Sequence, residues 1–235
     1  MSNEISNKEK SEMNIKSIGE SSVTTLNGDV MNRTIEAGVW QESPLVGVDG
    51  LLKKHQSLLS PVFRLTERPF LELVNLRGDT RDPAFLAAVE ATVGCRLPEA
   101  PNTVARGKQY DLLWLGPDEW LARSTMPHGG ASAAPLEGAL QRAFAGLFAS
   151  ATDIGSGFTV LEIKGSHVRD VLARGCPLDL HPQKFKVGQC AQSFYFKATL
   201  TLLPIADDTF ELVIRRSFAD YFINIMLDAA APLMS

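Results

Sequence analysis

The cysteines are the first residues to consider for chemistry, as metal ligands or as nucleophiles. The chain has three of them, Cys95, Cys176 and Cys190, and the last two lie in the stretch Arg174–Phe196. Neither of these two stands in a Cys-x-x-Cys or His-x-x-x-His pattern at metal-ligand spacing. Cys176 directly follows the end of a predicted helix, where the helix dipole raises the pKa of a thiol. We therefore interpret all three cysteines as structural residues that behave as small hydrophobic side chains.

The four histidines stand in separate predicted elements, and none is at metal-ligand spacing: His55, His128, His167 and His181. We expect His167, near a helix start, and His181, before a proline, to make single hydrogen bonds. The glycine-rich run Gly155–Gly157 precedes its strand, whereas a phosphate-binding loop follows a strand and opens a helix. The sequence therefore predicts neither a metal site nor a nucleotide site.

The paired acidic residues Asp118–Glu119 and Asp207–Asp208 both fall at predicted turns. Because a raised carboxyl pKa requires burial, we interpret them as solvated turn residues and not as an acid–base pair. Arg215–Arg216 ends a strand, where it is placed to clamp an anion or a partner's carboxylate, or to form a surface salt bridge. Trp114 and Trp120 lie on adjacent predicted strands, and we interpret them as core or interface aromatics.

Composition limits the classes of protein to which the chain can belong. It has 235 residues, of which 45% are hydrophobic and 21% charged, and a net charge of −4. These values are typical of a globular protein. The sequence lacks the clustered basic residues of a nucleic-acid-binding domain. The polar amino terminus has no hydrophobic segment of the kind that secretory signals carry, and three widely spaced cysteines favour reduced thiols. We predict a cytoplasmic protein with no membrane contact.

Apolar periodicity and turn residues divide the chain beyond residue 60 into strands and helices. The first group is a strand at 68–78, a helix from Asp82 and Pro83 to Gly94, a hairpin of Tyr110–Leu115 with Glu119–Arg123, and a helix at 135–150. The second group is a strand at 152–165, a helix between Ser166 and Gly175, strands at 192–206 and 209–216, and a helix at 217–230. Hairpin pairs of strands between helices predict an α+β fold of two βαββα layers with antiparallel sheets.

The same patterns suggest four regions. Residues 1–42 are rich in Ser, Asn, Glu and Lys, which predicts a disordered polar extension. Residues 43–60 contain enough leucine to form a docking arm, although the arm is equally able to pack on its own domain. Residues 61–150 and 151–232 form the first and second α+β halves. Between helix and strand, Arg174–Phe196 holds a string of turn-forming residues, which suggests a subunit that contacts another molecule: Gly175, Pro177, Pro182 and Gly188.

From about Leu65 to Pro232 the sequence resembles the gamma subunits of heterotetrameric sarcosine oxidases. The matching strings are LRGD at Leu76–Asp79, PNTV at Pro101–Val104, LWLGPDEWL at Leu113–Leu121, D-x-x-x-x-FTVLEI-x-G at Asp153–Gly165, RDVLARGCPLDLHP at Arg169–Pro182, GQCAQ at Gly188–Gln192 and FEL-x-x-x-RS at Phe210–Ser217. The order and spacing of these strings make the match specific.

The resemblance implies a fold distantly similar to the folate-binding aminomethyltransferase fold of the glycine-cleavage T-protein. It also implies alpha, beta and delta partner subunits, with FAD, FMN and NAD on alpha and beta and zinc on delta. Such complexes oxidise sarcosine to glycine and hydrogen peroxide and pass the one-carbon unit to tetrahydrofolate, as methylenetetrahydrofolate, or release it as formaldehyde. The family's gamma subunit carries no catalytic, cofactor-binding or metal-binding residue to transfer to this chain.

Three other functions remain open from the sequence. A stand-alone folate-binding aminomethyltransferase-like protein would need strand-borne acids, for which Asp153 and Glu162 are the candidates; of these, Glu162 is expected to face solvent. A gamma-type subunit of an N-methylglutamate dehydrogenase would have a similar sequence. A homo-oligomeric scaffold would use the apolar arm Leu45–Leu59.

Overall fold

The computed structural model describes residues 43–45, 61–127 and 135–233, and the backbone of four short strands between residues 24 and 40. The chain divides into two compact units, Met1–Glu42 and Ser43–Ser235. In the first unit, two antiparallel pairs are described: β1 (Thr24–Leu26) with β2 (Asp29–Met31), and β3 (Ile35–Glu36) with β4 (Val39–Trp40). The rest of residues 1–42 lies outside the described residues, so the predicted disorder of this region stays a prediction.

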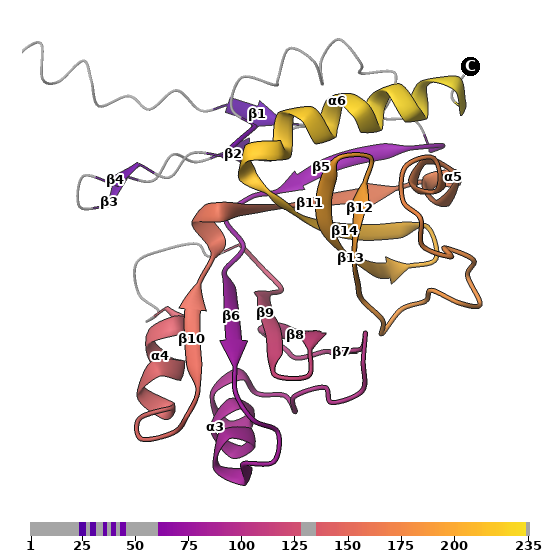
Figure 1. The fold of residues 1–235 in the computed structure, drawn as a ribbon. Helices are drawn as coiled ribbons and strands as arrows, with labels where there is room; N and C mark the ends of the chain where they lie inside the picture. Colours follow the sequence, from indigo (N-terminus) through magenta and orange to yellow (C-terminus); the bar gives the residue numbers. More distant parts are fainter. Residues whose placement is uncertain are drawn as a thin grey trace, which may run out of the picture. The chain divides into compact units, whose positions relative to one another are not determined.

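The second unit contains two five-stranded antiparallel sheets (Figure 1). The first sheet has the order β10-β6-β9-β8-β7, with β6 at Leu73–Arg77, β7 at Val104–Ala105, β8 at Tyr110–Gly116, β9 at Glu119–Ser124 and β10 at Ser150–Asp153. The second sheet has the order β12-β13-β14-β11-β5, with β5 at Arg64–Arg68, β11 at Phe158–Lys164, β12 at Ala191–Tyr195, β13 at Ala198–Ala206 and β14 at Thr209–Arg215. The predicted α+β class with antiparallel sheets is confirmed.

The chain passes between the sheets more often than the predicted order of elements implied. Strand β5 was not predicted and pairs with β11 in the second sheet, although it precedes β6 of the first. Strand β10 begins at residue 150, the predicted end of the first half, and pairs with β6. The single strand predicted at 192–206 was wrong, because the segment is a β12–β13 hairpin that turns at Phe196 and Lys197. Phe196 has a φ of 51°, a conformation that neither glycine nor asparagine signals there.

The described residues of the second unit also form four α-helices: α3 (Pro83–Val93), α4 (Leu136–Ala143), α5 (Val168–Ala173) and α6 (Ala219–Ala230). Short 3₁₀ turns occur at η2 (Gly155–Gly157), η3 (Arg216–Phe218) and η4 (Ala231–Leu233). The start of α3 is confirmed, since Asp82 is its N-cap and accepts a hydrogen bond from the Ala84 amide. The predicted N-cap Ser166 was wrong, because α5 begins at Val168 after His167. No helix of the described residues is long and apolar enough to cross a membrane.

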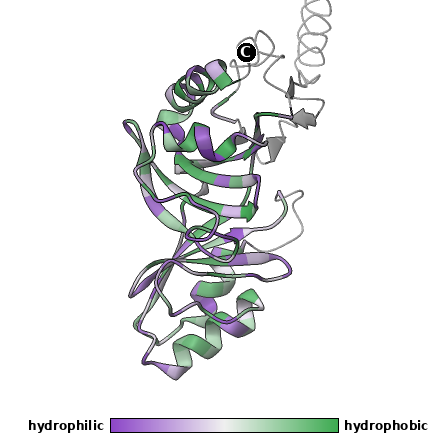
Figure 2. Ribbon diagram, turned by 90° about the vertical axis from the view of Figure 1, so that its right-hand side faces the viewer, coloured by the Kyte–Doolittle hydropathy of each residue, from purple (hydrophilic) through white to green (hydrophobic). Residues whose placement is uncertain are grey.

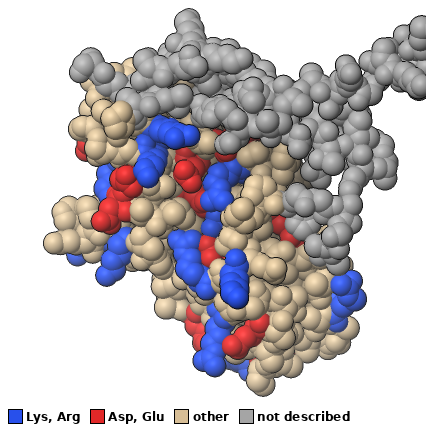
Figure 3. All heavy atoms as spheres, turned by 180° about the vertical axis from the view of Figure 1, so that it is seen from behind, with Lys and Arg blue, Asp and Glu red and all other residues tan. Residues whose placement is uncertain are grey.

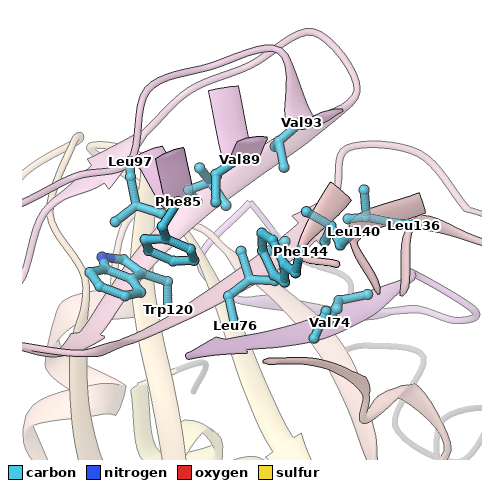
Figure 4. Close-up of a cluster of buried hydrophobic side chains, with 13 residues drawn as sticks. Val74, Leu76, Phe85, Val89, Val93, Leu97, Trp120, Leu136, Leu140 and Phe144 are labelled. Carbon is cyan, nitrogen blue, oxygen red and sulfur yellow. The ribbon is translucent and has the colours of Figure 1, made fainter. Parts of the chain in front are cut away.

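The outer face of the first sheet packs on α3 and α4. Phe85 is at the centre of this core, with ring centroids 5.9 Å from Trp120 and 5.4 Å from Phe144 (Figure 4). A Cβ atom at Gly78 would lie 2.5 Å from the Phe85 ring, so the glycine of the LRGD string leaves room for this side chain. Hydrophobic and hydrophilic segments follow one another along both the strands and the helices (Figure 2).

A second apolar cluster joins the two sheets. It contains leucines and valines from both, among them Leu73, Leu113 and Leu121 of the first sheet and Val160, Leu203 and Val213 of the second. The strand period of two explains why one strand contributes to both clusters, because alternate side chains face either the opposite sheet or the helices. Charged side chains at the inward-facing positions of the two sheets therefore meet between the sheets.

Candidate functional site

Buried charges of opposite sign meet between the two sheets. Arg123 of β9 donates from Nη2 to Asp111 Oδ2 of β8 at 2.6 Å and from Nη1 to Glu211 Oε2 of β14. The side chains of Arg123 and Asp111 are 3% exposed, and that of Glu211 is fully buried. Register explains the arrangement, since Arg123 and Asp111 are direct partners across β9 and β8 on the inner face of the first sheet. One guanidinium thus links the two sheets.

Two further arginines complete this inter-sheet network. Arg68 of β5 donates to Glu211 Oε1 and, at 2.8 Å, to the carbonyl of Thr125. Arg106 donates to Asp111 Oδ2 at 2.5 Å and to the carbonyl of Pro204 at 3.2 Å. Each of these two arginines also connects residues of one sheet to residues of the other. We refer to Arg68, Arg106, Asp111, Arg123 and Glu211 as the inter-sheet network.

The network's hydrogen bonds favour a structural role. Both oxygens of Glu211 accept from guanidinium groups, and Asp111 Oδ2 accepts from two of them. The remaining oxygen, Asp111 Oδ1, accepts from the backbone amide of Gly107 at 3.3 Å. A general base needs a carboxylate oxygen within reach of a substrate proton, and here each oxygen is already occupied by the protein itself. The arrangement holds the sheets in register.

A third buried carboxyl lies on the helix-facing side of the second sheet. Glu67 of β5 accepts hydrogen bonds from Ser43 at 2.5 Å and from Thr159 at 2.7 Å. Burial raises the pKa of Glu67, and the two hydroxyl donors offset part of that rise. Leu45 next to it is fully buried. Residues 43–45 therefore pack on their own domain, while residues 46–60 lie outside the described residues and the docking arm stays a prediction.

A surface pocket of about 860 Å³ lies where β6, the β8–β9 turn and the segment after α4 meet. Its charged residues pair with one another: Arg77 with Asp118 at 2.6 Å, and Arg81 with Asp79 at 2.7 Å. The hydrogen bond from Arg81 lowers the pKa of Asp79 to about 2. Phe148, at the rim, is 100% exposed. Two of the family strings, LRGD and LWLGPDEWL, contribute to this pocket.

The surface view agrees with paired charges. On the face in Figure 3, basic and acidic side chains lie side by side over the described residues. The predicted turn location is confirmed for Asp207–Asp208 and for Asp118, whereas Glu119 is the first residue of β9. Arg77 forms ion pairs with both Asp118 and Glu119. Such exposed pairs contribute roughly 0–1 kcal/mol each to stability.

The structural interpretation of the cysteines agrees with their surroundings. Cys176 and Cys190 are buried, Cys95 is partly buried, and all three are free thiols. Burial raises the pKa of Cys190 to about 11 and also raises that of Cys95. A thiol with a raised pKa is a poor nucleophile at neutral pH.

The predicted histidine and tryptophan contacts are confirmed where the residues are described. His167 Nδ1 lies 2.8 Å from Asp170, and His181 Nδ1 accepts from the Gln183 amide at 3.3 Å. His55 and His128 lie outside the described residues. Trp120 is fully buried and donates from Nε1 to the Pro98 carbonyl at 2.8 Å, as a core aromatic should. Its cross-strand partner Trp114 packs against the same core.

The candidate acids and the arginine pair do not form one site. Asp153 is on β10 of the first sheet, where its side chain accepts from the Gly155 amide at 2.8 Å and shapes η2. Glu162 is on β11 of the second sheet; it is half-buried and stands opposite Glu211, so its expected exposure to solvent was overstated. Arg215 lies 5.5 Å from the Phe158 ring centroid, whereas Arg216 interacts electrostatically with Glu67. The two arginines therefore have different partners.

Sequence reasoning missed the inter-sheet network. Its signal was a single charge at an inward position of an otherwise apolar strand, as at Asp111, Arg123 and Glu211. The partners are far apart in sequence, since Arg123 and Glu211 are separated by 88 residues. Among the described residues, no cluster of three or more His, Cys, Asp or Glu side chains is arranged to hold a metal ion.

Comparisons with known proteins agree on one family. The family model described as "Sarcosine oxidase, gamma subunit family" matches residues 77–232. Sarcosine oxidase subunit gamma of Corynebacterium sp. (strain P-1) is 31% identical over 173 residues, which cover 73% of this chain and 82% of the relative. A chain of the heterotetrameric sarcosine oxidase of Corynebacterium sp. U-96, solved with pyrrole 2-carboxylate, has a TM-score of 0.74 and 24% identity, over 83% of this chain and 97% of that one. The aminomethyltransferase T of Bartonella henselae is a more distant likeness, with a TM-score of 0.49 and 14% identity, over 91% of this chain and 55% of that one.

Proposed function

This chain belongs to the sarcosine oxidase gamma subunit family, and from that membership we propose that it is a non-catalytic subunit of a sarcosine-oxidising complex. The observation that carries the proposal is the family match, which extends over residues 77–232 and includes four strands of each sheet, while β5 and most of β6 precede it. Within this region lie the inter-sheet network, apart from Arg68, and all three cysteines.

The chemistry of the buried groups supports a structural role. The inter-sheet network uses its carboxylate oxygens to bind arginines and a backbone amide. Burial raises the pKa of the Cys190 thiol to about 11, which keeps it protonated at neutral pH. These groups stabilise the fold, and the chemical step belongs to other chains of the complex.

We assign the partners and cofactors by family. The alpha, beta and delta subunits would assemble with this chain, with FAD, FMN and NAD bound on alpha and beta and zinc on delta. The complex would oxidise the N-methyl group of sarcosine, reduce oxygen to hydrogen peroxide, release glycine and transfer the one-carbon unit to tetrahydrofolate or release it as formaldehyde. The complex would work in the cytoplasm, where free thiols such as the three here remain reduced.

Co-expression tests this function directly. The tagged full-length chain is expressed with the alpha, beta and delta subunits from the same host, and the purified material is examined for composition and flavin absorbance. We expect the larger chains to co-purify in fixed stoichiometry with flavin and with sarcosine-dependent peroxide formation. A colourless, single-chain product from cells that contain all four chains would overturn the proposal.

Two further measurements identify the amine substrate and test whether the isolated chain binds folate. Comparing sarcosine with N-methylglutamate on the purified complex identifies the amine that is oxidised. Calorimetric titration of the isolated chain with tetrahydrofolate tests the stand-alone alternative. We expect no binding heat, because the two candidate acids, Asp153 and Glu162, are on strands of different sheets.

A further inference from the structure

The margin of the second sheet at its edge strand β12 carries exposed apolar side chains. Three of the five large exposed hydrophobic residues among those described are here: Val187, Phe194 and Phe196, with 49%, 48% and 44% of their surface exposed. All three belong to the segment 174–197, which runs from the end of α5 through a long loop into β12. Exposed aromatic residues gathered in one segment are typical of an interface.

The buried Tyr195 orients its two phenylalanine neighbours, and Phe196 is also held by contacts with Gly175. Tyr195 is fully buried and donates to the Val171 carbonyl at 3.0 Å, so its neighbour Phe194 points to the opposite side of β12. The Phe196 amide donates to the Gly175 carbonyl at 3.0 Å, and its ring packs edge-on against Tyr195, with centroids 5.0 Å apart. A Cβ atom at Gly175 would lie 2.5 Å from the Phe196 ring. A side chain at position 175 would therefore clash with the exposed ring of Phe196.

The backbone at Phe196 is also unusual. Its φ of 51° is in the left-handed region, which a bulky aromatic residue rarely adopts. Such a conformation costs on the order of 1–3 kcal/mol and persists only where surrounding contacts enforce it. A rigid aromatic that is already oriented loses little conformational freedom when it binds, which suits an interface anchor.

The same segment is positively charged. Between residues 174 and 197 there are four basic residues, Arg174, Lys184, Lys186 and Lys197, and one acidic residue, Asp179, in a chain whose net charge is −4. All four basic residues are exposed. Lys184 and Lys186 flank Phe185, which is buried and stacks on Phe210 with centroids 6.3 Å apart, so both lysines point away from the core. A segment that exposes both basic and apolar side chains is complementary to an acidic partner that also carries apolar residues.

We propose that this surface, the β12 margin (Lys184, Lys186, Val187, Phe194, Phe196 and Lys197), binds an acidic segment of a partner subunit that also carries apolar side chains. The inference rests on the proposed function, because it requires partner subunits. The apolar side chains of the partner cover Phe194 and Phe196, and its carboxylates lie against the lysines. The binding is consequently weakened by salt, because the lysines remain at a solvated rim.

The pocket beside Phe148 is the competing surface, and its charges argue against it. Its two arginines are already paired within the chain, Arg77 with Asp118 and Arg81 with Asp79. A charged partner would have to displace these ion pairs. The pocket therefore provides a matched control for the β12 margin.

The test uses the four co-expressed chains, with the tag on this chain and the wild type as reference. Two pairs of variants are compared: Lys184→Glu/Lys186→Glu against Lys108→Glu/Lys164→Glu, and Phe194→Ser against Phe148→Ser. Lys108, Lys164 and Phe148 are all exposed, so each control changes the same residue types elsewhere on the surface. Recovery of the partner chains is measured from 0.05 to 0.5 M NaCl, and the melting temperature of each isolated variant is measured to establish that it folds.

We expect both margin variants to reduce partner recovery about tenfold or more, as loss of a buried aromatic anchor or reversal of rim charges does. Recovery with the wild type should fall as salt rises, and the two control variants should behave as the wild type. If the wild type recovers the partner chains and the folded margin variants recover them equally well, this inference is overturned and the proposed function stays intact. Loss with Phe148→Ser alone transfers the interface to the pocket. Failure of the wild type itself to recover partners is instead the failure of the proposed function.

Discussion

Replacing Arg123 with alanine should be among the most damaging single changes to stability. Arg123 bridges Asp111 and Glu211, so its loss leaves each carboxylate with one guanidinium partner. Glu211 is fully buried and cannot recover the lost hydrogen bond from solvent. Removal of one member of a buried ion pair lowers the free energy of unfolding by about 3–5 kcal/mol. We therefore expect Arg123→Ala to lose stability in that range.

The expected loss is readily measured. For a folded unit of this size, about 1 kcal/mol corresponds to a shift in melting temperature of about 2–4 °C, so the melting temperature should fall by about 6–20 °C. Urea unfolding, followed by circular dichroism, gives the free energy of unfolding independently. Arg81→Ala is the matched control, because Arg81 is 89% exposed and its pair with Asp79 is worth roughly 0–1 kcal/mol. A loss below about 1 kcal/mol for Arg123→Ala would mean that the network does not hold the sheets together, and our interpretation would be wrong.

Three further predictions concern other residues of the described structure. Burial raises the pKa of Glu67, so its carboxyl favours folding most below its unfolded pKa, and this contribution is lost as pH rises through the folded pKa. In urea titrations, the stability of Glu67→Gln relative to the wild type should therefore increase between pH 4 and pH 8. A stability difference that does not change with pH would contradict the raised pKa. Cys190, with a thiol pKa of about 11, should react with a disulfide reagent at pH 8 far more slowly in the folded chain than in urea, and comparable rates would show that it is accessible. Trp120→Ala should lower the free energy of unfolding by about 3–5 kcal/mol because Trp120 is fully buried, whereas Phe148→Ser should change it by less than about 0.5 kcal/mol; similar effects in the two variants would argue against this division between core and surface.

Local signals in the sequence were reliable where the structure depends on local contacts. The start of α3 is an example, because Asp82 and Pro83 act on amides within the same turn. The β8–β9 hairpin was likewise recognisable, because its turn and both strands are adjacent in sequence. The β12–β13 hairpin was missed because its turn contains Phe196, whose conformation depends on Gly175 and Tyr195 and not on an intrinsic preference.

Non-local contacts explain the remaining failures. Strand β5 contains charged residues that read as a polar connection, and it becomes a strand only because β11 lies beside it. The same holds for the inter-sheet network, whose Arg123 and Glu211 are on strands of different sheets. Each of these charges resembles a surface residue until its partner is known. Tertiary pairing, and not the local pattern, decides whether such a residue is buried.

The two main features of the second unit fit a subunit whose task is to present a surface. A buried ion pair seldom adds net stability over a well-packed apolar contact, but its directional hydrogen bonds specify one arrangement of the groups it joins. Here the groups joined are two sheets, since Arg123 of the first sheet binds Glu211 of the second. The second of these sheets carries the β12 margin at its edge. A fixed position of that sheet also fixes where the β12 margin lies relative to the first sheet, as a docking surface requires.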